Sequence, residues 1–495
     1  MKTALFVMYM FLFVFLGTNI TTAAAPEGLD TNAIDDYIER EMRASRIPGL
    51  ALGIIQDGEI TYLQGYGSAG SGQKVAPETP FIIGSLSKSF TALASMQLVE
   101  AGKLELDAAV QEYLPWFTMA GDYDAGEITV RHLLVQTSGI PNLAGVTSLA
   151  ESSTRSMEKE VRDLSTTELV SEPGETYIYS NANYLILGLI IEAVSGQSYS
   201  DYVRSHILDP LEMDNSYLSR QKGEAGGMAS GHVRWFGLTR ESRVQYLDNS
   251  LPAGFIISSA GDMCRYLQMY LNQGSYDGTE VLSKDSIEAM FEPGVTGEHG
   301  GGYAMGLLKR VEGETTIINH DGSTQGFNAG MAFSPEEKWG VVVLTNTSGQ
   351  IELTAGAITM GIADFLMGNE PESITRSPFI AYLILLLIIL GLLVLAVRSF
   401  IIMPQRWKKT LKTNPPRGFK NLARRVILPV VVELLAPFLI LVYIPAGAGF
   451  PVWRLLALFH PDLVYGLLLL AYIMLAKALW RAFIAIRIIS TPGRT

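Results

Sequence analysis

Cysteine is almost absent from this chain: Cys264 is the single thiol among 495 residues. One cysteine excludes an internal disulfide, so a folded domain of this chain depends on its hydrophobic core alone. A catalytic thiol needs a paired histidine, and the sequence suggests none near this position. We therefore interpret Cys264 as a small, buried hydrophobic residue.

Three catalytic motifs are also missing from the sequence. The chain has no HExxH zinc motif and no GxxxxGK[ST] phosphate-binding loop. It has no GxSxG turn, which argues against an α/β-hydrolase. We therefore expect neither a metal nor a cofactor.

Acidic residues are scarce near the end of the chain, where only Glu433 and Asp462 follow residue 376. Residues 26–376, in contrast, contain 47 acidic and 22 basic residues, a net charge of −25. A surface this acidic repels polyanions. The sequence therefore argues against nucleic acid as a partner.

The first 25 residues have the features of a signal peptide. Lys2 precedes an apolar core at residues 4–16, and Ala23, Ala24 and Ala25 supply the small side chains of a cleavage site. We predict cleavage near Ala25, with an uncleaved membrane anchor as the alternative. Either reading places the following domain outside the cytoplasm.

Three long apolar segments, 378–402, 426–447 and 460–482, close the chain. Each is long enough to cross a bilayer, which takes about 20 helical residues. The segment 403–425 is basic and contains no acidic residue, so the positive-inside rule predicts a cytoplasmic loop there. We therefore expect a multi-pass protein of the cell membrane with residues 26–370 outside.

Glu433 falls within the second apolar segment, where a carboxyl group is costly. The sequence leaves two readings open. Glu433 either hydrogen-bonds in its protonated form to a neighbouring helix, or it serves transport or sensing.

Residues 26–370 read as one α+β domain with strands at both ends. Asp57-Gly58 separates two β-rich runs near the start, and 329–346 contains a second hairpin pattern near the end. Helical patterns such as 87–101 and 183–194 fill the middle. This order predicts an antiparallel sheet built from both ends of the domain, flanked by helices and carrying a helical subdomain.

Ser85 and Lys88 form the first candidate catalytic pair. A β-rich run leads into Ser85, helical residues follow, and a spacing of three places both side chains on one helix face. A serine needs a nearby base to act as a nucleophile, and a lysine can serve when burial lowers its pKa. The start of a helix also favours developing negative charge.

Two further elements follow in the chain. Tyr179 and Asn181 pair a proton acceptor with an amide that binds carbonyl groups. His320 and Gly322 lie just before the last hairpin, where a glycine allows a substrate to approach the strand. Each element alone is weak evidence for a site.

In this order, the three elements resemble the SxxK, YxN and K/HxG motifs of penicillin-recognising serine hydrolases. Residues 30–368 are most similar to the class C β-lactamase-like group, which includes D-Ala-D-Ala carboxypeptidases, D-aminopeptidases and esterases. The resemblance implies a β-lactamase/transpeptidase-like fold and a bacterial source. It covers the whole exported domain and none of the three apolar segments.

The resemblance also implies a role for each motif residue. Ser85 becomes acylated, while Lys88 and Tyr179 share the proton transfers, with the choice of base left open. Asn181 would bind the substrate amide. The remaining implied contacts come from one strand, where His320 and Gly322 line the substrate and Ser323 supplies an oxyanion-hole N–H together with that of Ser85.

The sequence departs from the class C pattern at two positions. His320 stands where those β-lactamases have lysine, and a neutral imidazole binds a β-lactam carboxylate less well than a permanent cation does. Gln136 stands where relatives often have histidine, and we interpret it as structural.

We therefore predict a membrane-anchored, extracytoplasmic acyl-serine hydrolase resembling a penicillin-binding protein that acts as a D-Ala or D-amino-acid peptidase. An esterase or a β-lactamase of the same fold is the alternative. A different class is a sensor that stays acylated by a β-lactam or a wall peptide. The expected partners are a small peptide, ester or β-lactam and the lipid bilayer, and the sequence does not indicate the oligomeric state.

Overall fold

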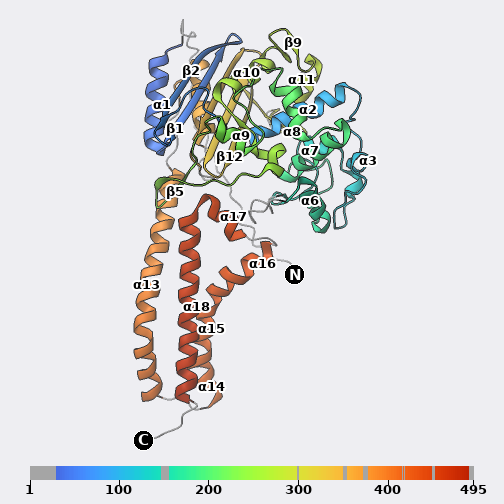
Figure 1. The fold of residues 1–495 in the computed structure, drawn as a ribbon. Helices are drawn as coiled ribbons and strands as arrows, with labels where there is room; N and C mark the ends of the chain where they lie inside the picture. The colour runs from blue at the N-terminus through green and yellow to red at the C-terminus, as the bar shows by residue number, and fades with distance from the viewer. Residues whose placement is uncertain are drawn as a thin grey trace.

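The computed structural model comprises a catalytic domain above a bundle of long helices (Figure 1). It describes residues 29–145, 155–297, 300–348, 354–371, 377–414, 416, 418–448 and 452–489. The predicted signal peptide, 1–25, lies outside the described residues.

An antiparallel sheet of eight strands forms the centre of the catalytic domain, in the order β10-β11-β12-β13-β14-β1-β2-β3. Its strands are β1 (Gly49–Gln56), β2 (Glu59–Gly70), β3 (Gln73–Lys74), β10 (Gly302–Tyr303), β11 (Leu308–Glu312), β12 (Thr315–Thr324), β13 (Phe327–Ser334) and β14 (Trp339–Thr345). The two predicted hairpins are β1–β2 and β13–β14. Because β1 pairs with β14, strands from both ends of the domain join in one sheet, as predicted.

Helices cover both faces of this sheet. α1 (Thr31–Ser45) and α12 (Thr354–Leu366) enclose a smaller core cluster with one face, where Leu50, Leu52 and Ile54 alternate along β1. α2 (Ser87–Glu100) and α10 (Ala260–Leu271) lie in the larger core cluster on the other face. Strands buried on both faces account for the nearly continuous burial of β1, β13 and β14.

The middle of the chain is mostly helical, as the sequence predicted. Its helices are α3 (Val110–Tyr113), α4 (Val130–Leu134), α6 (Met157–Arg162), α7 (Asn181–Ser195), α8 (Tyr199–Val203), α9 (Arg220–Ala225) and α11 (Lys284–Met290). Three short strand pairs accompany them: β4 (Phe81–Ile82) with β7 (Ile257–Ser258), β5 (His232–Trp235) with β6 (Leu238–Glu241), and β8 (Ser275–Tyr276) with β9 (Thr279–Glu280).

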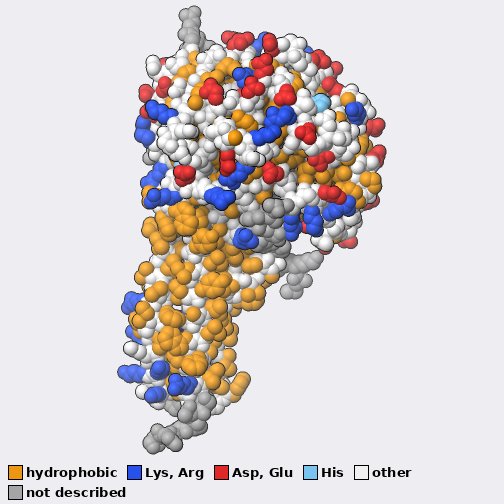
Figure 2. All heavy atoms as spheres, viewed as in Figure 1, with side chains coloured by type: hydrophobic (Ala, Val, Ile, Leu, Met, Phe, Trp, Pro, Cys, Tyr) orange, Lys and Arg blue, Asp and Glu red, His pale blue; other side chains and the backbone are white. Residues whose placement is uncertain are grey.

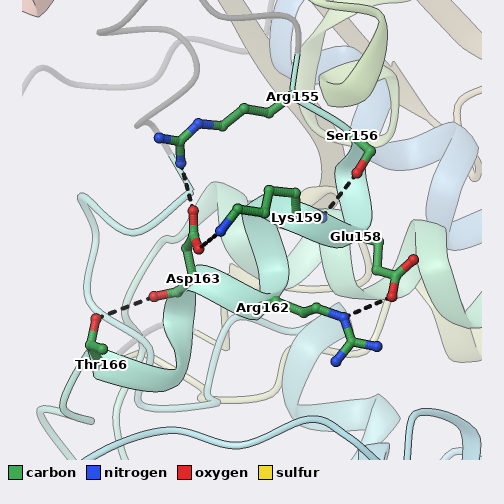
Figure 3. Close-up of polar contacts among 7 residues, drawn as sticks. All are labelled: Arg155, Ser156, Glu158, Lys159, Arg162, Asp163 and Thr166. Carbon is green, nitrogen blue, oxygen red and sulfur yellow. Dashed lines mark hydrogen bonds and ion pairs between the residues drawn. The ribbon is translucent and has the colours of Figure 1, made fainter.

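A local polar network surrounds α6 (Figure 3). Asp163 accepts hydrogen bonds from Arg155 and Lys159, and Glu158 accepts one from Arg162 Nε at 2.7 Å. The Ser156 hydroxyl caps the helix by accepting from its backbone. α6 in turn packs against α7, the helix that begins with Asn181.

Three helical segments beyond the catalytic domain, Ile380–Thr413, Phe419–Gly447 and Pro461–Ile488, are long and apolar enough to cross a membrane. The helices of this region are α13 (Ser377–Thr413), α14 (Phe419–Leu422), α15 (Leu428–Phe438), α16 (Ile444–Ala448), α17 (Val452–Phe459) and α18 (Pro461–Ile489). α13 runs on through the first part of the basic segment 403–425, which we expected to be a loop. Helix is possible there because the charged side chains of that part are mostly exposed.

The helical bundle is attached to the catalytic domain through the β5–β6 hairpin. The Trp235 ring stacks on Tyr465 of α18 with ring centroids 6.1 Å apart. The backbone N–H of Phe236 donates to Asp462 Oδ2 at 2.5 Å, and that of Gly237 donates to the Tyr382 hydroxyl at 3.3 Å. These contacts hold the first turns of α13 and α18 against the domain.

Candidate active site

Ser85 lies in a tight turn, Gly84–Leu86, that leads directly into α2. Gly84 has φ +57°, and a Cβ there would lie 2.5 Å from the backbone N of Ser323, so this position requires glycine. The Ser87 hydroxyl donates to the Gly84 carbonyl at 2.7 Å and accepts from the Ile256 N–H at 3.1 Å. The turn is thereby held between β12 and the chain around Ile256.

The Lys88 amine is fully buried beside Ser85. Its Nζ lies 3.1 Å from Ser85 Oγ, 2.8 Å from Asn181 Oδ1 and 2.5 Å from the Ala253 carbonyl oxygen. None of these partners is charged. Burial therefore lowers the pKa of Lys88 well below its ordinary value.

Tyr179 is the second group in contact with the serine. Its hydroxyl donates to Ser85 Oγ at 2.8 Å, and its ring lies 4.9 Å from Lys88 Nζ. Burial raises the pKa of Tyr179, so the phenol keeps its proton at neutral pH. The hydroxyl that touches Ser85 is therefore a hydrogen-bond donor.

These contacts are balanced if Lys88 is neutral. A neutral amine has two N–H groups and one lone pair, which match the two pure acceptors, Asn181 Oδ1 and the Ala253 carbonyl, and the hydroxyl proton of Ser85. Ser85 Oγ then accepts from Tyr179 and donates to Lys88. The arrangement can take up the serine proton without leaving a buried group unpaired.

Gly322 and Ser323 meet the serine turn from β12. A Cβ on Gly322 would lie 2.0 Å from the Ile83 carbonyl oxygen, so only glycine allows this approach. Ser85, Asn181 and Ser323 line one cavity of about 70 Å³. Of the six residues predicted to accompany Ser85, the structure therefore brings Lys88 and Tyr179 into contact with its side chain, Asn181 and Ser323 into the same cavity, and Gly322 against its turn.

His320, the seventh predicted residue, is buried against Tyr303. Its Nδ1–H donates to the Asp321 carbonyl at 2.7 Å, and its Nε2 accepts from the Tyr303 hydroxyl at 3.3 Å. Burial, with a smaller effect of Lys88, lowers the pKa of His320 to about 4. The imidazole is therefore neutral at physiological pH, and its ring contacts Tyr303 rather than Ser85.

Gln136 positions the Tyr179–Asn181 turn. Its side-chain carbonyl accepts from the Ser180 N–H at 2.9 Å and from Asn183 Nδ2 at 2.5 Å, and its backbone carbonyl accepts from the Ile178 N–H at 2.8 Å. The sequence indicated a structural residue here, but it gave no sign of these partners.

Three other residues of the site had no sequence signal. The Ala253 carbonyl binds Lys88, Tyr303 binds His320, and Phe459 lines the cavity at Ser85. None of the three belongs to a motif, and each reaches its partner only through the fold.

Two other residues of interest lie outside the site. Cys264 is fully buried, and burial raises the pKa of its thiol to about 12, which agrees with a structural residue. Glu433 Oε1 lies 2.7 Å from Lys477 Nζ and 3.2 Å from Arg481 Nη1, so its partners are two cations of α18.

Comparison with known proteins gives one family across the catalytic domain. The family model for Beta-lactamase matches residues 34–359. The chain is 29% identical over 321 residues to Protein flp of Staphylococcus aureus (strain MW2), which covers 64% of this chain and 63% of flp. The chain thus spans less than two thirds of the length of that relative.

Two other similarities cover the same region. Penicillin-binding protein 4 of Amycolatopsis lactamdurans is 34% identical over 252 residues, 49% of this chain and 65% of that protein. The structure of an octameric penicillin-binding protein homologue from Pyrococcus abyssi superposes with a TM-score of 0.64 at 30% identity, covering 71% of this chain and 80% of that one.

Proposed function

Because the chain belongs to the Beta-lactamase family of serine hydrolases, we propose that it is a membrane-anchored acyl-serine hydrolase with Ser85 as its nucleophile and Lys88 as the base. The observation that carries the proposal is the contact of Ser85 Oγ with a buried amine that has no charged partner. Such an amine gives up its proton more readily than an exposed lysine, because burial lowers its pKa, and can therefore act as a proton acceptor.

In the acylation step, Ser85 Oγ attacks the substrate carbonyl carbon while its proton moves to Lys88 Nζ. The Tyr179 hydroxyl, 2.8 Å from Oγ, helps to return a proton to the leaving group. The acyl-enzyme is then attacked by water, which gives a proton to the same pair of groups, and that proton passes to Ser85 Oγ as the acyl group leaves as a carboxylic acid. Lys88 and Tyr179 end each cycle in their starting protonation states.

The tetrahedral oxyanion is stabilised by the backbone N–H groups of Ser85 and Ser323. The support for this role is the close packing of the serine turn on β12, where the backbone N of Ser323 lies next to Gly84. One such donor is worth about 3–4 kcal/mol in the transition state. Asn181 presents its Oδ1 to Lys88, which directs its amide NH₂ to a substrate carbonyl.

Among possible substrates, we favour a D-Ala or D-amino-acid peptide over an ester, and either over a β-lactam antibiotic. The resemblance of the three motifs to those of D-Ala-D-Ala carboxypeptidases and D-aminopeptidases supports a peptide. The neutral, buried His320 supports the low rank of β-lactams, because it offers their carboxylate no permanent cation.

We propose further that the catalytic domain, residues 26–370, lies outside the cytoplasm, with the membrane segments at 378–402, 426–447 and 460–482. Apolar side chains cover the helical bundle, and Lys and Arg gather at its end farthest from the domain (Figure 2). That distribution supports a cytoplasmic location for the basic segment 403–425.

The test is release of D-alanine from an N-acyl-D-Ala-D-Ala peptide by the full chain in detergent, with Ser85→Ala as the control. We expect release by the wild type and none by the variant. Ser85-dependent turnover of an activated ester without peptide cleavage would favour the esterase alternative. A stable benzylpenicillin adduct without turnover of either substrate would favour the sensor.

A further inference from the structure

The helical bundle contributes a residue to the cavity at Ser85. Phe459, the last residue of α17, lines this cavity together with Leu247 and Phe255 of the catalytic domain. Its side chain is buried, with 4% of its surface exposed. Phe459 lies 100 residues beyond the end of the family match and only two residues before the membrane-length helix that begins at Pro461.

The corner that carries Phe459 is fixed to the catalytic domain. Asp462, 3% exposed, accepts hydrogen bonds from the Phe236 N–H and from the Tyr382 hydroxyl. These bonds join α18, α13 and the β5–β6 hairpin at one point. Phe459 is therefore held as part of the cavity wall by the same contacts that attach the bundle to the domain.

Exposed apolar side chains surround this junction. Trp235, Phe236 and Leu238 of the β5–β6 hairpin are 37%, 52% and 50% exposed. Aromatic side chains at the end of a membrane-crossing helix are typical of the bilayer interface. The aromatic side chains of this junction place the bilayer interface at the level of Asp462, which lies three residues after Phe459 in the chain.

The cavity is too small to enclose a whole substrate. Its volume of about 70 Å³ is well below the ~300–1,000 Å³ of pockets that enclose drug-sized ligands. Only the part of a substrate around its carbonyl group fits, and the rest must extend past the rim. Phe459 forms the part of the cavity wall that belongs to the bundle, so a substrate chain that leaves the cavity along Phe459 runs towards the bilayer surface.

We propose that the substrate of Ser85 carries a long apolar chain that remains at the bilayer while the carbonyl group enters the cavity, and that Phe459 is the contact that selects this chain. The proposal rests on the acyl-serine hydrolase function proposed above and names its substrate class. Phe459 contacts the chain but no reacting atom, so it is a specificity-determining residue and takes no part in the chemistry.

The experiment measures kcat/KM for p-nitrophenyl butyrate and p-nitrophenyl laurate with the full chain in lipid nanodiscs. The wild type is expected to prefer the laurate, and Phe459→Ala to lower the ratio of kcat/KM for the laurate to kcat/KM for the butyrate about tenfold, through the KM of the laurate. Phe459→Leu should restore most of the preference. Leu456→Ala is the matched control, because Leu456 lies on the same helix but is 39% exposed.

The outcomes separate the two proposals. If neither ester is hydrolysed in a Ser85-dependent manner, the apolar-chain substrate is overturned, and if the same preparation also releases no D-alanine from the N-acyl-D-Ala-D-Ala peptide, the proposed hydrolase function is overturned as well. If both are hydrolysed but Phe459→Ala leaves their ratio unchanged, or lowers both equally, the role of Phe459 is overturned while the hydrolase function stands. A wild-type preference for the butyrate overturns the apolar-chain substrate.

Discussion

Lys88 in the catalytic domain and Lys477 in the helical bundle are both largely withdrawn from solvent, but their partners differ. Lys88 contacts a hydroxyl, an amide oxygen and a peptide carbonyl. Lys477 lies 2.7 Å from the carboxylate of Glu433. Burial without a carboxylate partner lowers the pKa of Lys88, whereas the Lys477–Glu433 contact joins two helices.

The surfaces of the two regions also differ in the kind of side chain that they expose. Charged side chains cover the catalytic domain, and apolar side chains cover the bundle (Figure 2). In the domain, Lys88 is buried next to residues of the larger apolar core cluster, such as Leu86 and Phe90. In the bundle, the Glu433 pair is internal and Leu387, Val394 and Ile486 face outward. The comparison teaches that the partner of a buried lysine, and not its burial alone, decides whether the lysine acts as a base or belongs to a structural ion pair.

Replacing each lysine by methionine should give the largest contrast. Lys88→Met removes the proposed base, and we expect kcat/KM to fall by about 10⁴-fold. Lys477→Met should leave the activity per folded molecule unchanged, since Lys477 contacts nothing at the site. Steady-state hydrolysis in detergent checks both, and near wild-type activity of Lys88→Met would remove Lys88 from the chemistry.

Removing Glu433 should destabilise the bundle. Glu433→Ala leaves Lys477 and Arg481 without their carboxylate, and loss of one partner of a buried ion pair costs about 3–5 kcal/mol. The free energy of unfolding in detergent, followed by tryptophan fluorescence, measures this. Glu433→Gln should cost less because its amide oxygen can still accept a hydrogen bond. Unchanged stability of Glu433→Ala would show that the ion pair does not hold the helices together.

The pH dependence of kcat/KM should contain an acidic limb that belongs to Lys88. Lys88 must be neutral to accept the serine proton, so activity rises with pH, about tenfold per pH unit below its lowered pKa, and then levels off. His320→Gln should leave this limb in place, because the pKa of His320 is about 4 and its ring is already neutral. A limb that shifts with His320→Gln would assign it to the imidazole instead.

His320 and Asp321 should have small, opposite effects on stability. The pKa of His320 falls from 6.5 to about 4 on folding, so its contribution is complete above pH 6.5 and is lost as the pH falls towards 4. Burial raises the pKa of Asp321 from 3.8 to about 6, so its contribution is present at low pH and is lost as the pH rises through 6. Between pH 4 and 6 the two oppose each other.

Single variants separate these two contributions. In Asp321→Asn, the contribution of His320 is no longer opposed by that of Asp321. The free energy of unfolding should then rise with pH by at most about 1.4 kcal/mol per unit. In His320→Gln, only the contribution of Asp321 varies with pH at this pair, and the free energy of unfolding should fall as the pH rises over the same range. Chemical denaturation at pH 4, 5 and 6 gives both slopes, and parallel slopes in the two variants would contradict the assignment.

Local patterns predicted most of the fold. The Asp57-Gly58 turn predicted β1–β2, and the run after Ser85 predicted α2, because turn chemistry and helix periodicity depend on neighbouring residues. The spacing of Ser85 and Lys88 was informative for the same reason, since one helical turn brings them together.

Long-range contacts were beyond the sequence. The Ala253 carbonyl carries no side-chain signal, yet it is an acceptor for Lys88. Phe459 follows two apolar segments and reads as part of a membrane region, and only the docking of α18 on the β5–β6 hairpin places it at the cavity. Such contacts depend on how distant segments pack.

The measurement that tests the central claim most directly is peptide-level mass spectrometry of the acylated protein. The full chain and Ser85→Ala are each incubated with benzylpenicillin, an N-acyl-D-Ala-D-Ala peptide and p-nitrophenyl laurate, then quenched in acid and digested. We predict an acyl group on the Ser85 peptide with at least one of these donors, and none on the variant. An adduct on another residue, or no adduct and no turnover with any donor, would contradict Ser85 as the nucleophile.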